Sequence, residues 1–154
     1  MRFKILLFML ICFGIGSIKA QNFVWAKKAS SVGIDEPQSM VLDKSGNVYT
    51  IGYFQDTCDF DPGPGSFTLA PSSSLDTFIL KLDSSGNFIW AIKIGGVGFI
   101  SAWHQASSIT VDSLNNIYAT GFFGGIVDMD PGPGTFTLSQ TGLHDVFVTK
   151  YTSN

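Results

Sequence analysis

Residues 41–54 read VLDKSGNVYTIGYF, and residues 110–123 read TVDSLNNIYATGFF, so the chain repeats itself with position 41 matching position 110. In the last eight positions of this stretch, apolar and aromatic side chains occupy both faces. That pattern predicts a strand sandwiched between two layers, preceded by a polar turn. The second copy has Asn115 where the first has Gly46. These residue types best tolerate positive φ, so we expect a left-handed turn position there.

Three further motifs recur in the same order along the chain. They are NFVWAKK at 22–28 and NFIWAIK at 87–93, DFDPGPGSFTL at 59–69 and DMDPGPGTFTL at 128–138, and DTFILK at 76–81 and DVFVTK at 145–150. The spacing between copies is wider for the later motifs than for the first, which places four extra residues of the second copy within 99–105. Two repeat units therefore fill the chain, one at 21–86 and the other at 87–154.

Each unit is expected to supply about four principal strands, because no stretch shows sustained helical periodicity. In the first unit these strands begin near Asn22, Gln38, Asn47 and Thr77, and a short additional pair flanks DPGPG. A four-stranded unit repeated along a chain is typical of a propeller blade. The sequence thus predicts an all-β fold of two tandem β-propeller-type blades, each with about four antiparallel strands.

A closed propeller needs about four to eight blades, so two blades make an incomplete propeller. Three explanations are open: the sequence is a fragment of a larger protein, several copies assemble into a ring, or two blades form a small stack of marginal stability. The repeats begin with the strand expected at 22–26. A propeller would use such an N-terminal strand to complete its last blade.

Residues 1–20 form a different kind of segment. Arg2 and Lys4 precede an apolar run over 5–15, and small residues lie near Ala20. This layout is typical of a secretory signal peptide at 1–20, which predicts a secreted or cell-surface protein with no membrane span in the mature chain. An N-terminal anchor that is never removed is the alternative. Lipid attachment at Cys12 is disfavoured by the bulky residues that precede it.

Loss of this segment changes the charge of the chain. Three of the nine basic residues leave with it, so the formal net charge moves from −3 to −6 and no Arg remains. Nucleic-acid binding is therefore excluded, because no cluster of positive charge exists to meet phosphates. Of the two cysteines only Cys58 remains, and the second unit has Val127 at the matching position. This exchange predicts a small buried apolar site, with an intermolecular disulfide as the alternative.

The motifs WAK, VLDKSGNVYTIGYF, DFDPGPGSFTL and DTFILKLDSSGNFIWA, in that order, resemble the bacterial β-propeller repeat known as SBBP. The closest form is the DFDPGPG-bearing version of exported Bacteroidetes-like proteins, and the resemblance covers essentially all of residues 22–151. It implies blades of a secreted β-propeller within a large multidomain protein that often carries a C-terminal sorting domain. This chain departs from that pattern because it has two units and ends at KYTSN, with no sorting domain.

The acidic, glycine-rich motif is a candidate metal site. Asp59 and Asp61 in the first unit, and Asp128 and Asp130 in the second, are predicted to share one face of an extended segment that could hold calcium. The motif lacks the third ligand and the final Glu of helix-flanked calcium loops. We favour a structural turn whose Asp side chains accept backbone N–H bonds. Paired-carboxylate hydrolysis is disfavoured, because neighbouring strand positions offer no two opposed faces for a sugar.

A binding site grafted onto repeats is expected where the two units differ. The main difference is the insertion with Trp103 and His104. An exposed aromatic loop there would bind a glycan or a partner protein, and a longer loop that only covers a sheet edge is the alternative. No catalytic residue is predicted, because the sequence has no G-x-S-x-G, P-loop or dinucleotide glycine motif. No cofactor is predicted apart from the calcium considered above.

Two function classes remain. The first is an exported, non-enzymatic binding or scaffold module, whose further blades come from the same polypeptide or from self-association. The second is part of a larger secreted hydrolase or lyase whose catalytic domain is not in this sequence. Glycan binding without turnover would favour the first class.

Overall fold

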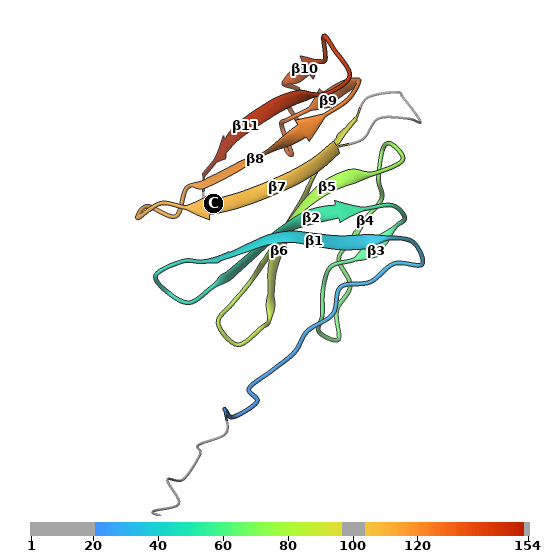
Figure 1. The fold of residues 1–154 in the computed structure, drawn as a ribbon. Helices are drawn as coiled ribbons and strands as arrows, with labels where there is room; N and C mark the ends of the chain where they lie inside the picture. Colours follow the sequence, from blue (N-terminus) through green and yellow to red (C-terminus); the bar gives the residue numbers. More distant parts are fainter. Residues whose placement is uncertain (1–20, 97–103, 153–154) are drawn as a thin grey trace, which may run out of the picture.

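Figure 1 shows the chain in a computed structural model that describes residues 21–96 and 104–152. These residues form antiparallel sheets and contain no helix, which confirms the all-β fold class. No segment of this part of the chain forms a helix that could span a membrane. The strands are β1 (Asp35–Leu42), β2 (Val48–Phe54), β3 (Cys58–Asp59), β4 (Thr68–Leu69), β5 (Asp76–Leu82), β6 (Phe88–Gly96), β7 (His104–Val111), β8 (Ile117–Phe123), β9 (Ile126–Asp128), β10 (Thr137–Ser139) and β11 (Asp145–Tyr151).

The first sheet contains β1, β2, β5 and β6 as antiparallel neighbours in that order. In the register of β2, Tyr49 pairs with Val41 of β1 on one side and with Lys81 of β5 on the other. β6 comes from the sequence of the second repeat unit, so this sheet crosses the boundary between residues 86 and 87. The end of β6 also pairs with β9, which joins the β9–β10 hairpin to the same sheet.

The strand predicted from Asn22 is the one clear error of the strand predictions. Residues 22–28 carry no strand, whereas the matching segment 87–93 lies in β6 and pairs with β5. Both edges of β5 are occupied, by β2 and β6, so residues 22–28 find no open edge beside it. Phe23 and Val24 are 82% and 81% exposed as a result. The same short motif therefore has different surroundings in the two units.

The second sheet contains β7, β8 and β11 and packs face to face across the first, with β7 against β1 and β2 (Figure 1). One apolar cluster fills the space between the sheets. The first sheet contributes Tyr49, Ile51, Ile79 and Ile94, and the β9–β10 hairpin joined to it contributes Val127 and Met129. The second sheet contributes Ala106, Ile109, Ile117, Ala119, Phe123 and Phe147. This cluster is the interface between the two sheets.

A second apolar cluster covers the opposite face of the first sheet. It contains Val48, Phe54, Cys58, Phe60, Phe78, Leu80, Leu82 and Ala91. Trp25 and Ala29 of the N-terminal segment pack against it, in the place of a further sheet. β2 and β5 are thus covered on both faces, which confirms the expectation for residues 47–54.

Three turns with the same hydrogen bonds join neighbouring strands. In the first, the Asp43 Oδ1 atom accepts the backbone N–H groups of Ser45 and Asn47, both at 2.9 Å. Asp83 and Asp112 make the matching bonds in the other two turns. The predicted left-handed position is confirmed, because φ is 79° at Gly46 and 63° at Asn115.

Gly52 provides a test of the packing within the first sheet. A Cβ atom at this position would lie 2.1 Å from the Glu36 carbonyl oxygen and 2.8 Å from the Phe78 ring. Because backbone and ring would both have to move, we expect Gly52→Ala to lower the free energy of unfolding by about 1–3 kcal/mol in urea denaturation. Gly132→Ala is the control, since its Cβ would meet only the Asp130 carboxylate at 3.1 Å. Equal losses in both variants would contradict this explanation.

Candidate functional site

The two DPGPG motifs occupy the loops of the β3–β4 and β9–β10 hairpins. In the first loop the Asp59 Oδ1 atom accepts the backbone N–H groups of Asp61 at 3.1 Å and Phe67 at 2.9 Å. In the second loop Asp128 accepts those of Asp130 and Phe136 at the same two distances. Each of these carboxylates therefore ties the start of its loop to the far side of the same loop.

The second aspartate of each motif explains the glycines that follow it. The Asp61 Oδ1 atom accepts the backbone N–H of Gly63 at 2.7 Å, and a Cβ atom on Gly65 would lie 2.3 Å from Asp61 Oδ2. The second loop repeats both features around Asp130. The glycines leave room for a carboxylate folded back over the loop. These contacts agree with a structural turn.

A calcium site at Asp59, Asp61, Asp128 and Asp130 stays a prediction. Within residues 21–96 and 104–152, no group of three or more His, Cys, Asp or Glu side chains is placed to hold a metal ion. The electrostatics of the first loop follow from its hydrogen bonds. The backbone N–H of Phe67, and then that of Asp61, holds the pKa of Asp59 below its ordinary value of 3.8.

The predicted contact loop falls mostly outside the described residues. Trp103 lies there, and His104 begins β7, where its backbone pairs with Phe123. Phe123 also pairs with Asp145, so the starts of β7 and β11 lie at one end of the second sheet. His144, another residue specific to the second unit, precedes β11, and its ring lies 5.1 Å from that of Phe122. Positions that differ between the units thus gather at this end.

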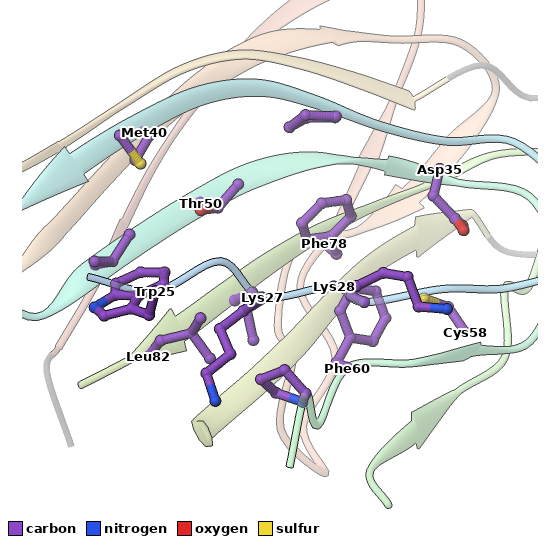
Figure 2. A pocket seen from close by; sticks show the side chains of 15 residues that line it. Trp25, Lys27, Lys28, Asp35, Met40, Thr50, Cys58, Phe60, Phe78 and Leu82 are labelled. Atoms are coloured by element: carbon purple, nitrogen blue, oxygen red, sulfur yellow. The ribbon is translucent and has the colours of Figure 1, made fainter. Parts of the chain in front are cut away.

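A groove of about 260 Å³ lies on the face of the first sheet that points away from the second sheet. Figure 2 shows the side chains that line it. Its apolar floor includes Phe60, Phe78 and Leu82, and the N-terminal segment contributes Trp25 and Ala29 to its lining. Lys27, Lys28 and Asp35 add charge to the lining. The groove therefore joins an apolar surface to charged side chains.

Cys58 also contributes to this groove and is fully buried in the second cluster. This burial confirms the expectation of a small apolar position. Burial, followed by the nearby negative charges of Asp35 and Asp59, raises the pKa of the Cys58 thiol to about 12. At neutral pH the thiol is therefore protonated, which does not suit a nucleophile.

A second hollow, of about 420 Å³, lies between β4, β6 and the second DPGPG loop, with Asp128 and Asp130 in its lining. Lys93 also lines it and donates to the Ala70 carbonyl oxygen and to Ser72 Oγ, both at 2.9 Å. The Lys93 Nζ atom lies 3.7 Å from Oδ2 of the buried Asp76. Lys93 thus holds the connection between β4 and β5.

Sequence reasoning missed both hollows. The groove depends on alternate apolar positions of β2 and β5, such as Val48, Leu80 and Leu82, whose pattern also fits an ordinary core. The usable signal is the N-terminal copy of the N-F-x-W-A motif, because no strand precedes it within residues 21–152. Lys93 carries no separate sequence signal, because the first unit also has a lysine, Lys28, at the matching position.

No family model matches the chain. The chain is 30% identical over 145 residues to a WD repeat-containing protein of Acanthamoeba polyphaga mimivirus, in an alignment that covers 84% of this chain. The alignment covers 10% of the viral protein, so this chain spans about a tenth of the length of that relative. WD repeats form four-stranded propeller blades. The match and the stacked antiparallel sheets together support a β-propeller-like repeat.

Thermal unfolding with and without metal tests the calcium hypothesis. Since carboxylate oxygens of both loops already accept backbone N–H groups, we expect the Tm of the purified chain to be the same in excess calcium and in excess chelator. A Tm that rises with calcium and falls with chelator would instead support the metal site. The double variant Asp61→Asn and Asp130→Asn would then have to abolish the calcium response.

Acid unfolding tests the hydrogen bonds of these turns. The pKa of Asp83 is lowered, chiefly by the backbone N–H of Asn87, as that of Asp59 is by Phe67. A carboxylate whose pKa is lower in the folded state than in the unfolded state stabilises the fold. This contribution is complete at a pH above the unfolded-state pKa, and it is lost as the pH falls through the folded-state pKa. We therefore expect the Tm to fall as the pH drops below about 4.

The matched variants for this acid unfolding are Asp59→Asn and Asp56→Asn. Asp59→Asn removes a titrating group and should make the Tm less dependent on pH in the acid range. The exposed Asp56 serves as the control for replacing an acidic side chain by its amide. If the Tm fell with decreasing pH at the same slope in the wild type and in both variants, Asp59 would not be the group responsible for the loss of stability.

Proposed function

We propose that the chain is an exported, non-enzymatic module of SBBP-type repeats, which binds a glycan or a protein partner within a larger β-propeller. One observation carries this proposal. The carboxylates that recur in both units, such as Asp43 and Asp112 or Asp59 and Asp128, accept backbone N–H groups of their own turns. Recurring acidic residues therefore serve folding, which leaves binding to the positions where the units differ.

The comparison with the viral protein supports the scaffold part of the proposal. That protein is named for its WD repeats and is about ten times as long as the matched region. A similar arrangement would make this chain part of a longer array of blades. Export rests on the signal-peptide pattern of residues 1–20.

The end of the second sheet where β7 and β11 begin is the proposed ligand site. Trp103 and His104 come from the insertion, and His144 adds a second imidazole whose ring contacts the half-buried Phe122. Aromatic rings with a polar edge are suited to sugar rings and to protein surfaces. A glycan is the first ligand to test.

Binding is tested with the chain collected from the medium of expressing cells, where N-terminal sequencing is expected to begin at Gln21. The labelled protein is applied to an array of bacterial and plant glycans. Trp103→Ala and His104→Ala are expected to weaken the binding at least tenfold. Val24→Ala is the control, since Val24 is exposed in the N-terminal segment.

The same samples distinguish the module from a hydrolase or lyase. We expect bound glycans to be recovered intact, with no release of reducing ends and no unsaturated product. Turnover that is lost in a site variant would refute the non-enzymatic proposal. Binding that is equal in Trp103→Ala, His104→Ala and the control would refute the proposed ligand site.

A further inference from the structure

The two sheets carry matching residues in opposite environments. Tyr49, Ile51 and Ile79 are fully buried on the face of the first sheet that meets the second sheet. Their counterparts in the second repeat unit lie on the opposite, solvent-facing side of the second sheet, where Val148 is 74% exposed. We define this outer face by Tyr118, Thr120, Phe122, Val146, Val148 and Lys150. The matching face of the first sheet, with Tyr49, Ile51 and Ile79, is buried against the second sheet.

The second sheet covers Tyr49, Ile51 and Ile79 with its inner face. The matching surface of the first sheet is the groove of Figure 2. Ile109, Ile117 and Phe147 of the second sheet pack into the cluster between the sheets. Their first-unit counterparts are Met40, Val48 and Phe78, and all three line the groove. Each of the two surfaces that meet between the sheets therefore has a second copy in the chain. One second copy is the outer face of the second sheet, and the other is the groove of the first sheet.

A ring cluster at the internal interface shows the same division. The Lys81 Nζ atom lies 4.9 Å from the Tyr49 ring and 6.0 Å from the Trp90 ring. On the outer face, Lys150 Nζ lies 5.3 Å from the Tyr118 ring. The counterpart of Trp90 in the N-terminal copy of the N-F-x-W-A motif is Trp25 of the groove. The outer face thus has the lysine and the tyrosine of this cluster, and the groove side has the tryptophan.

The backbone edges show a further correspondence. β5 pairs with β6, whereas its counterpart β11 pairs only with β8 within the described residues. The segment with the sequence of β6, residues 22–28, carries no strand. It is followed by an antiparallel bridge between Ser30 and Asp59, which matches the pairing of Gly95 with Asp128 at the end of β6. The N-terminal segment is therefore already paired at its end in the way that β6 is.

We propose that a second copy of the chain docks head to tail, with the groove of one copy on the outer face of the other. Residues 22–28 of the docking copy then pair with β11 as the fourth strand of the second sheet, and Trp25 joins Tyr118 and Lys150. The proposal rests on the propeller-type module proposed above and names its partner. Rings of two to four copies would contain four to eight sheets, the range of closed propellers.

The oligomeric state of the purified chain tests this proposal, by light scattering during gel filtration. Val148→Lys places a charge on the outer face, and Met40→Lys places one in the groove, where Met40 is 65% exposed. Each variant alone is expected to be monomeric, with association weakened at least tenfold. An equimolar mixture is expected to form a dimer and nothing larger, because one intact groove then meets one intact outer face.

Three results would overturn the proposal. They are a wild-type chain that stays monomeric at high concentration, a Met40→Lys variant that associates like the wild type, and a mixture that stays monomeric. Leu114→Lys is the control, since Leu114 is 76% exposed in the turn between β7 and β8, and it should associate normally. Circular dichroism confirms that each variant keeps its β structure.

Hydrogen exchange tests the strand addition separately. In the wild-type assembly the amides of β11 should exchange at least tenfold more slowly than in the Met40→Lys monomer, while those of β2 should not differ. Equal exchange of β11 in both proteins would refute the pairing with residues 22–28. The glycan binding of the Met40→Lys monomer is measured alongside. Its persistence in a protein that does not associate would separate failure of this inference from failure of the proposed function.

Discussion

The central strands of the first sheet are apolar on both faces, so both faces must be covered, and most of the structure follows from that requirement. Tyr49 and Ile51 of β2 point to one side, and Val48 and Phe54 point to the other. Full burial of one large apolar side chain contributes about 1.5–3 kcal/mol relative to exposure. The second sheet covers the first side. On the second side, the N-terminal segment and the β3–β4 hairpin take the place of another sheet.

Polar residues have a different task in the same fold. Aspartates begin the turns after β1, β5 and β7, and others close the two DPGPG loops, each by accepting backbone N–H groups. Asp76 goes furthest, because its buried carboxylate accepts from Ser72 and Ser73 and lies beside Lys93. Its counterpart Asp145 is only half-buried and accepts from the backbone N–H and the hydroxyl of Thr141. Equivalent residues thus differ in environment, because within the described residues β11 has no strand in the place that β6 occupies beside β5.

Local sequence was sufficient for the features that depend on local contacts. The exchange of Gly46 for Asn115 located a left-handed turn, and the pattern over 47–54 predicted a strand covered on both faces. The short pair flanking DPGPG was also predicted correctly. The strand expected from Asn22 was not found, because a strand needs a free edge and the sequence of 22–28 does not reveal that the edge of β5 is taken by β6. The groove was missed for a related reason, since the exposure of Met40 depends on which layer is present above it.

The buried thiol of Cys58 has a practical consequence for studying how this side of the protein opens. It lies under the N-terminal segment, and its protonated form reacts slowly with alkylating reagents. Reaction therefore requires that the covering segment lifts away or that the chain unfolds. Because Cys12 belongs to the leader-like region, a chain without that region has this single sulfhydryl group. The rate at which Cys58 is alkylated would therefore measure how often that opening occurs.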